Sequence, residues 1–454
     1  MKRVLIIGLD GASWDLLTPW IKEKKLPTLE KLMKNGLYGN LKSVVPALSA
    51  PAWTSLATGK NPGKHGIFDF TTSDGGIVNS NDVKGERIWD ILSKNGFSCC
   101  VINFPITYPP QKINGCMISS FLTPPGREDF TYPPFLINML KKYDYKLDLE
   151  LEKYKLPKDV DRIKKYHLRF ELLPEIYDIV RKRFEISIKL MKVKKWDFFV
   201  IVLKMTDSIC HLFWDRRDIL LEFFKELDEH IKKIIQEFEK NGDEYFTFVV
   251  SDHGFGPAPT KCINLYPLIK DLVGPPLKWR LMSYLSSIPG ANIIVSRISR
   301  VWIIRKGILK KQKQLGVKLW GIYFKDKKLR KKVIQRLREV RIPEGRVKVF
   351  RGVWEREEVY KGKHVRDAPD IIFLPNPDYK PAYLPSNRIF TEGFSVMPGD
   401  HTFYPEGILI ISGKNCKKNH KINMKLIDIT PTILRLFGVP IPDSIDGRPL
   451  KEVL

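Results

Sequence analysis

The sequence predicts an α/β fold, namely a doubly wound and mostly parallel sheet with two inserted cap regions. Short apolar runs rich in Val, Ile and Phe recur along the 454 residues. These runs do not alternate polar with apolar positions, which is typical of strands buried on both faces. Helical stretches separate the runs, and such alternation implies crossover connections between parallel strands. A chain of this length can bury a core large enough for one big domain with insertions.

The elements of the core are expected in a regular order. Strands are predicted at residues 4–9, 99–104, 198–203, 246–251, 370–374 and 407–412. Helices are predicted at residues 13–34, 85–94, 218–239 and 425–437, and Gly438 ends the last of them as a helix stop. These elements assign the core to three segments, residues 1–110, 196–256 and 367–454.

Two long intervals interrupt this alternation, and we expect both to be caps that shape the entrance to a substrate site. Residues 111–195 begin rich in proline and continue into a helical pattern, in which apolar residues between 176 and 191 recur every three or four positions. Residues 257–366 contain a second amphipathic helix, with an apolar face between 329 and 340. The first interval is therefore predicted to be a helical cap and the second a basic cap.

The net charge of +26 is concentrated in one segment. Between Lys278 and Lys348 there are 21 Lys and Arg but only three acidic residues, so this segment alone contributes +18. Such a block attracts nucleic acid or an anionic membrane surface. It is equally explained as the solvated face of an inserted domain, and both interpretations stay open.

Several features indicate a cytoplasmic protein without a membrane span. No window approaches the roughly 20 apolar residues of a transmembrane helix. The apolar run that ends at Gly8 is too short and wrongly flanked for a secretory signal. The six cysteines show no C-x-x-C pairing, so we expect reduced thiols.

Six side chains with metal-ligand chemistry stand beside the predicted strands: Asp10, Asp207, His211, Asp252, His253 and His401. Carboxylates and neutral imidazoles are ligands for divalent cations. The loops at the carboxyl ends of parallel strands open into a common crevice. Asp207 and His211 have helical spacing and point the same way. The set predicts a two-metal site.

Each of these residues alone has an ordinary explanation. An Asp after a strand is often a helix N-cap, and a lone His such as His401 is often a loop residue satisfied by its neighbours. The hydroxyl of Ser49 adds to the pattern, because it lies just ahead of a predicted helix start at residues 52–58, where a nucleophile would be wanted. The N-terminus of that helix would add partial positive charge. Together the residues favour an active site.

The order of these motifs resembles the alkaline phosphatase superfamily, and most closely its type I phosphodiesterase and nucleotide pyrophosphatase branch. The resemblance runs from the opening IIGLDG to the tail DITPTILRLFGVPIPDSIDGRPL and fades inside the two caps. It rests on the segment from PALSAPAW to TG and HGI, and on the strand-borne SDHG. It implies two divalent metal ions, usually zinc and sometimes manganese. The ligands implied for one ion are Asp207, His211 and His401, and those for the other are Asp10, Asp252, His253 and the Ser49 oxygen.

The resemblance also implies a reaction. Ser49 stands where the nucleotide pyrophosphatases carry Thr, so a hydroxyl is kept, and it would attack phosphorus to form a covalent intermediate that water cleaves. The implied activity is hydrolysis of phosphodiester or pyrophosphate bonds in a phosphoester or nucleotide-like substrate. One departure concerns Phe70, which stands where those enzymes place a phosphate-binding Asn. Asn103, at the end of the strand CCVINF, is either its replacement or a turn residue before Pro105. His65, in KHGI, is expected to be structural.

Other activities remain as alternatives. A phosphomonoesterase or a phosphoglycerate mutase-like enzyme would use the same metal site. An inactive metal-bearing protein could use the basic region to bind nucleic acid or anionic lipid. A sulfatase is disfavoured, because its maturation needs an Arg where Trp53 follows Ser49-Ala50-Pro51-Ala52.

Overall fold

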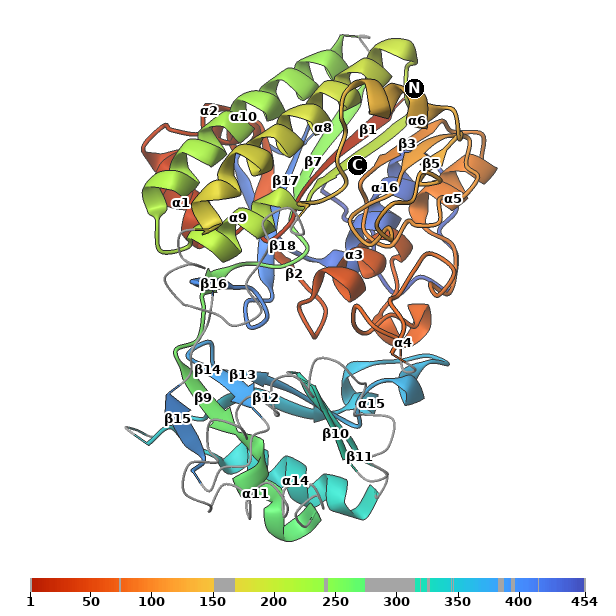
Figure 1. Cartoon of the computed structure of the whole chain (residues 1–454). Coiled ribbons are helices and arrows are strands. Elements are labelled where there is room, and N and C mark those ends of the chain that lie inside the picture. Colours follow the sequence, from red (N-terminus) through yellow and green to blue (C-terminus); the bar gives the residue numbers. More distant parts are fainter. Residues whose placement is uncertain are drawn as a thin grey trace. The chain divides into compact units, whose positions relative to one another are not determined.

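The computed structural model describes residues 2–72, 75–150, 168–240, 244–273, 315–318, 320–324, 327–343, 345, 347–382, 388–392, 397–414 and 416–452 (Figure 1). The chain divides into two compact units. One comprises Met1–Phe70, Ile77–Ala258 and Val396–Leu454, and the other comprises Thr71–Gly76 and Pro259–Ser395. Of the predicted basic region, residues 278–314 lie outside the described residues.

The first unit is built on a nine-stranded sheet with the strand order β18-β2-β17-β7-β1-β6-β3-β4-β5. Its strands are β1 (Arg3–Leu9), β2 (Gly36–Lys42), β3 (Cys99–Ile102), β4 (Gly115–Ile118), β5 (Thr131–Tyr132), β6 (Phe198–Leu203), β7 (Tyr245–Val250), β17 (Glu406–Gly413) and β18 (His420–Lys425). The central β1 pairs in parallel with both β6 and β7. Every residue of β1 and β6 is buried, as their unbroken apolar runs predict. The sheet is mixed but mostly parallel, which confirms the predicted fold class.

Strand β17 runs antiparallel to both of its neighbours, β7 and β2. Its beginning therefore lies at the edge of the sheet where β7 ends, and Ser251 N donates to Ile408 O at 3.0 Å there. A residue that precedes β17 consequently reaches the same edge as residues that follow the parallel strands. This reversal brings His401 to the edge where Asp10 and Asp252 lie.

Helices cover both faces of the sheet (Figure 1). The helices on one face are α1 (Trp14–Lys22), α2 (Pro27–Lys34), α8 (Leu173–Val193), α9 (Met205–Phe213) and α10 (Arg217–Glu239). Those on the other face are α3 (Ser49–Thr58), α5 (Ile88–Lys94) and α16 (Ile429–Leu436). Alternate residues of β1 face different layers, with Leu5 and Ile7 in the first core and Val4 and Ile6 in the second. The arrangement is the three-layer sandwich of a doubly wound protein.

The largest differences from the predicted helices concern two of them, while the helix expected at residues 85–94 begins three residues later, at Ile88. The helix expected at residues 13–34 is split into α1 and α2, because Pro27 begins a new helix at a position where its missing N–H costs nothing. The helix expected at residues 425–437 starts only at Ile429. Leu426–Asp428, directly before it, form a 3₁₀ helix, and Lys425 is the last residue of β18, which pairs in parallel with β2.

The second unit contains two small sheets, with strand orders β10-β11-β13-β12 and β14-β9-β15. Their strands are β9 (Lys261–Asn264), β10 (Leu315–Lys318), β11 (Gly321–Phe324), β12 (Phe350–Glu355), β13 (Ile371–Pro375), β14 (Tyr379–Ala382) and β15 (Phe390–Glu392). The helices α11 (Leu265–Val273) and α14 (Lys327–Glu339) belong to this unit, and Val333 and Leu337 of α14 pack against Phe373. The strand predicted at residues 370–374 thus forms in a smaller sheet and not in the nine-stranded one, because β11 and β12 pair with its two edges.

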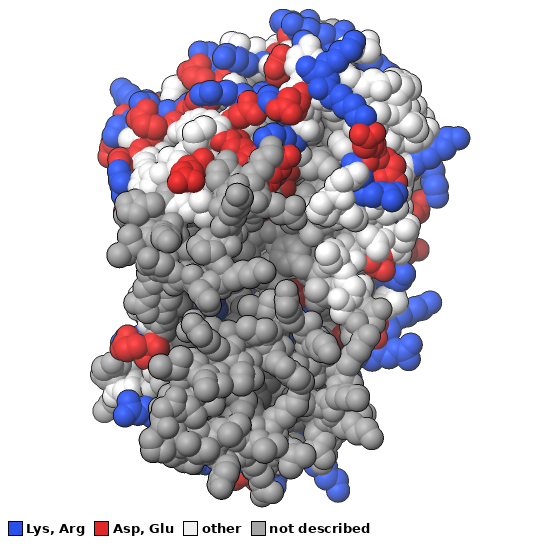
Figure 2. All heavy atoms as spheres, viewed as in Figure 1, with Lys and Arg blue, Asp and Glu red and all other residues white. Residues whose placement is uncertain are grey.

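Surface charge is mixed over the long helices of the first unit. Figure 2 shows Lys and Arg side chains interspersed with Asp and Glu over α8 and α10. Several of them are paired, as in Arg181 with Glu226 at 2.6 Å and Lys225 with Glu222 at 3.0 Å. The described part of the chain contains no helix that is both long enough and apolar enough to span a membrane.

Candidate active site

The ends of three neighbouring strands supply most of the candidate site. Asp10 directly follows β1, and Asp207 lies in the first turn of α9, just after β6. Asp252 and His253 follow β7, and His401 comes from the loop ahead of β17. The structure brings these residues together, because β1, β6 and β7 are adjacent and parallel and β17 is reversed.

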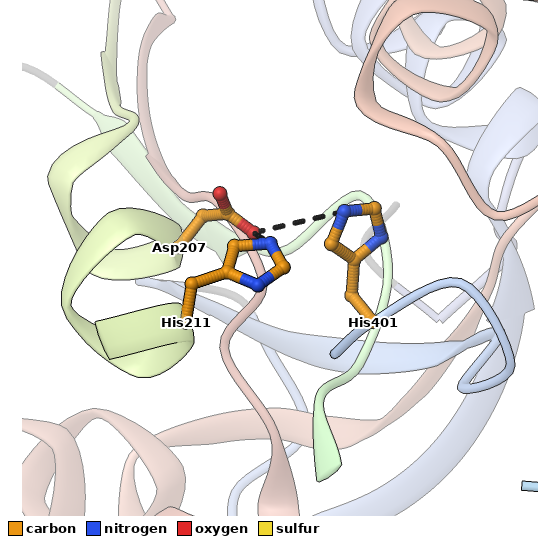
Figure 3. A group of neighbouring side chains, drawn as sticks. All are labelled: Asp207, His211 and His401. Atoms are coloured by element: carbon orange, nitrogen blue, oxygen red, sulfur yellow. Dashed lines mark ion pairs between the residues drawn. The ribbon is translucent and has the colours of Figure 1, made fainter. Parts of the chain in front are cut away.

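Asp207, His211 and His401 form one cluster, and their ligand atoms lie within 4.8 Å of one another (Figure 3). Oδ1 of Asp207 is 3.4 Å from Nε2 of His211 and 4.0 Å from Nε2 of His401. Asp207 and His211 project from one face of α9 at the i, i+4 spacing that the sequence predicts. In Figure 3 both imidazoles approach the same carboxylate oxygen.

A second cluster joins Asp10, Asp207 and His253, again within 4.8 Å. Nε2 of His253 is 3.6 Å from Oδ1 of Asp10 and 3.2 Å from Oδ2 of Asp252. The N–H of Gly11 donates to the other oxygen of Asp252 at 3.3 Å. Because Asp207 belongs to both clusters, its carboxylate lies between two groups of ligands.

Ser49 is the first residue of α3 and lies at the second cluster. Its Oγ donates to Oδ1 of Asp10 at 3.3 Å and lies 3.3 Å from Nε2 of His253. The N-terminus of α3 thus opens on the carboxylates, where the helix dipole adds partial positive charge. The hydroxyl, the imidazole and the carboxylate that the sequence singled out separately are in mutual contact.

The three histidines share one orientation. Nδ1 of each ring lies against a backbone carbonyl oxygen, at 2.9 Å from Gly399 for His211, 3.1 Å from Ala47 for His401 and 3.0 Å from Gly254 for His253. A carbonyl only accepts, so each Nδ1 carries the proton and each Nε2 presents its lone pair. These lone pairs face the carboxylates, which is how metal-binding histidines are held by their outer partners.

Burial and crowded charge shift the pKa values of the site. Burial raises the pKa of Asp10 and Asp252 well above the usual range, and for both the nearby carboxylate of Asp207 raises it further. Burial also lowers the pKa of His253 to about 4 and that of His401 to about 3. Both imidazoles are therefore neutral near pH 7, which is the protonation state of a metal ligand.

The donor set fits divalent cations. Oδ1 of Asp207 and Oδ2 of Asp252 are buried, and no group among the described residues donates a hydrogen bond to either oxygen. A buried acceptor without a partner costs about 1–3 kcal/mol, and more when it is charged. Cations placed among these oxygens and the Nε2 lone pairs would satisfy all of them, and three His with three Asp are ligands typical of zinc and also suited to manganese.

Trp53 contacts the site, and the sequence alone did not predict this contact. Its Nε1 donates to Oδ2 of Asp10 at 3.0 Å, so Ser49 and Trp53 each bind one oxygen of the same carboxylate. The signal was their spacing of four residues, which places both on one face of α3. Gly8 leaves room for the indole, since a Cβ at this position would lie only 2.5 Å from Cη2 of Trp53.

Replacing Trp53 by phenylalanine is expected to destabilise the protein by about 1–3 kcal/mol more than the same change at Trp89. Both indoles are buried and pack edge-on against Phe104. Within the described part of the chain Nε1 of Trp89 has no hydrogen-bond partner, so the Trp89→Phe variant loses volume without breaking a hydrogen bond. Urea unfolding of both variants gives the difference. Equal losses would show that the bond to Asp10 contributes nothing.

Two further residues considered from the sequence, His65 and Asn103, are held by contacts that indicate structural roles. His65 is fully buried, accepts from Ile67 N at 3.1 Å and lies 2.8 Å from Ser55 Oγ, which supports the structural role expected for it. The Asn103 amide donates to Ser119 O at 3.0 Å and its oxygen accepts from Tyr145. These two bonds, together with a φ of 52° at Asn103, favour its role as a turn residue.

Comparison with known proteins agrees with this geometry. The family model "Type I phosphodiesterase / nucleotide pyrophosphatase" matches residues 4–401. No curated protein matches the chain.

Several solved structures have the same fold. Human ectonucleotide pyrophosphatase/phosphodiesterase 5 is similar at 14% identity and a TM-score of 0.56, covering 98% of this chain and 97% of that one. An inactive form of the murine protein in complex with AMP has 14% identity and a TM-score of 0.57, covering 97% and 96%. Phosphonoacetate hydrolase from Sinorhizobium meliloti 1021, in complex with phosphonoformate, has 14% identity and a TM-score of 0.60, covering 94% of each chain.

Proposed function

This chain belongs to the type I phosphodiesterase/nucleotide pyrophosphatase family, and from that premise we propose that it is a two-metal phosphohydrolase with Ser49 as its nucleophile. The supporting observation is the contact of the Ser49 hydroxyl with both Asp10 and His253, each at 3.3 Å. In this proposal Asp207, His211 and His401 hold one divalent cation. Asp10, Asp252, His253 and the Ser49 oxygen hold the other.

In this proposal Ser49, Asp10 and Trp53 have different roles. When bound, the two cations would lower the pKa of the Ser49 hydroxyl and neutralise charge on the phosphate. The Ser49 hydroxyl points its proton at Oδ1 of Asp10, which leaves a lone pair of Oγ for the phosphorus. The indole of Trp53 fixes the second oxygen of Asp10, so this carboxylate cannot turn away from the nucleophile.

The reaction would proceed by two displacements at phosphorus. In the first, the bond from Ser49 Oγ to phosphorus forms as the bond to the leaving oxygen breaks. In the second, water attacks the same phosphorus, the bond to Oγ breaks and Ser49 regains a proton. The positive end of α3 opposes the negative charge that builds on the phosphate oxygens in both steps.

We propose phosphodiester or pyrophosphate bonds as the substrate class. A murine protein with the same fold binds AMP, and phosphonoacetate hydrolase shows that the fold also accommodates a phosphonate. A nucleotide-like phosphoester is therefore the first substrate to examine. Zinc is the proposed metal, because imidazole nitrogen and carboxylate oxygen both suit it.

A substrate screen tests the proposal. The purified protein, supplied with zinc or manganese, should hydrolyse bis-p-nitrophenyl phosphate or a nucleotide pyrophosphate, and EDTA should stop the reaction. Phosphomonoesters are included to measure the preference. A protein that binds its metals but hydrolyses none of these phosphoesters would instead be a metal-bearing binding protein.

A further inference from the structure

Lys204 lies three residues before the proposed metal ligand Asp207, and the proposed mechanism assigns no role to its side chain. It directly follows β6 and is the N-cap of α9, the helix that carries Asp207. Its carbonyl accepts from Asp207 N at 3.1 Å. Thr206, in the same turn, donates to the backbone oxygen of Asp10 at 2.6 Å. The turn that begins at Lys204 is therefore bonded to Asp207 through Lys204 and to Asp10 through Thr206.

The ammonium group of Lys204 is held in place and is still accessible. Its Nζ lies 3.0 and 3.1 Å from the two carboxylate oxygens of Asp148. It also lies 5.2 Å from the centre of the Phe121 ring, within the range of a cation–π contact. The side chain remains 22% exposed, so a solute can reach it.

Aromatic contacts connect this ammonium with the apolar cluster that contains Ala50. The Phe121 ring lies 6.3 Å from that of Phe70. Phe70 packs against the small apolar cluster that includes Ala50, the residue after the nucleophile. Because neither phenylalanine side chain can donate a hydrogen bond, a charged phosphate oxygen on this side needs another partner.

We propose that Lys204 is a substrate-binding residue that contacts a non-bridging phosphate oxygen, and that Asp148 positions its ammonium group. This inference rests on the proposed phosphohydrolase activity and narrows its substrate class. A cation attracts a dianionic phosphate more strongly than a monoanionic one. Lys204 therefore favours substrates with a terminal phosphate over simple diesters, and its loss should move the preference toward diesters.

The experiment compares Lys204→Met and Lys204→Gln with Lys182→Met. Lys182 is a matched control, since its side chain is 20% exposed and ion-paired with Asp144 and Asp178. For the dianion p-nitrophenyl phosphate, both Lys204 variants should lose about tenfold in kcat/KM, equivalent to about 1.4 kcal/mol. For the monoanion bis-p-nitrophenyl phosphate they should lose clearly less, and inorganic phosphate should inhibit them less. Metal content and the control variant should be unchanged.

Three outcomes overturn the inference. The Lys204 variants could hydrolyse both substrates at wild-type rates. They could instead lose both activities in equal proportion, which would indicate a structural tether between Lys204 and Asp148. In either case an active wild type would leave the proposed function standing. If the metal-loaded wild type hydrolyses neither substrate, the proposed function fails and this inference fails with it.

Discussion

Replacing Ser49 by alanine is expected to abolish turnover, with kcat lowered on the order of 10⁴-fold or more, as when other enzymes lose a nucleophile that acts together with its partners. The change removes the only atom of residue 49 that can attack phosphorus. It also removes the contacts of Oγ with Asp10 and His253. Steady-state rates and mass spectrometry of acid-quenched enzyme measure the effect, and the wild type should carry on Ser49 the phosphoryl group of the substrate together with the ester group that did not leave.

Ser43→Ala is the control for this variant. Ser43 is buried like Ser49, but its hydroxyl has no hydrogen-bond partner among the residues that the structure describes, so its loss should change neither folding nor turnover. Full activity of Ser49→Ala would assign the nucleophile to another group, such as a water molecule. Loss of activity in both variants would point to the packing of this segment instead.

Replacing Asp207 by asparagine is expected to lower the metal content of the purified protein from two ions to one or none, and kcat/KM by on the order of 10³-fold. The reason is its shared position, because its carboxylate belongs to both ligand clusters. Asparagine keeps the shape but removes the negative charge. Elemental analysis gives the metal content, and thermal unfolding with and without EDTA gives the coupled stability. The unfolding temperatures of the variant and the wild type should differ strongly in zinc and little in EDTA, because metal ions that bind only the folded state stabilise it.

Asp228→Asn separates this effect from the general cost of changing a buried carboxylate. Asp228 is buried on α10, where its two oxygens accept from Thr28 N at 2.8 Å and Leu29 N at 2.9 Å. This variant should lose stability equally in zinc and in EDTA and keep its metal. An Asp207→Asn protein that retains two ions and full activity would contradict the ligand assignment.

The sequence predicts much of the site because its strands are short, apolar and followed at once by ligands. Asp10 and Asp252 could be placed at one edge from the parallel arrangement alone. His401 could not be placed in this way, because its position depends on β17 being antiparallel, and strand direction is a property of distant pairing. His401 could be named as a candidate from its place beside a predicted strand, but only the resemblance to a known family assigned it to the same ion as Asp207 and His211.

The local sequence pattern also fails to predict two other features of the structure. The run at residues 370–374 predicts a strand correctly, but it contains nothing that distinguishes the sheet of β11 and β12 from the nine-stranded one. In the sequence, Trp53 is typical of a core aromatic residue. Its indole donates a hydrogen bond at the site only because Asp10, which follows β1, lies next to it in the fold. Contacts between segments far apart in the chain decide both.

The central claim is that two metal ions lie around Asp207, and a crystal structure of the protein grown with zinc tests it directly by anomalous scattering at the zinc edge. The account predicts two anomalous peaks. One should be ligated by Asp207, His211 and His401, and the other by Asp10, Asp252 and His253 beside the Ser49 oxygen. A structure with no peak among these residues, at a zinc concentration that supports turnover, would contradict the account.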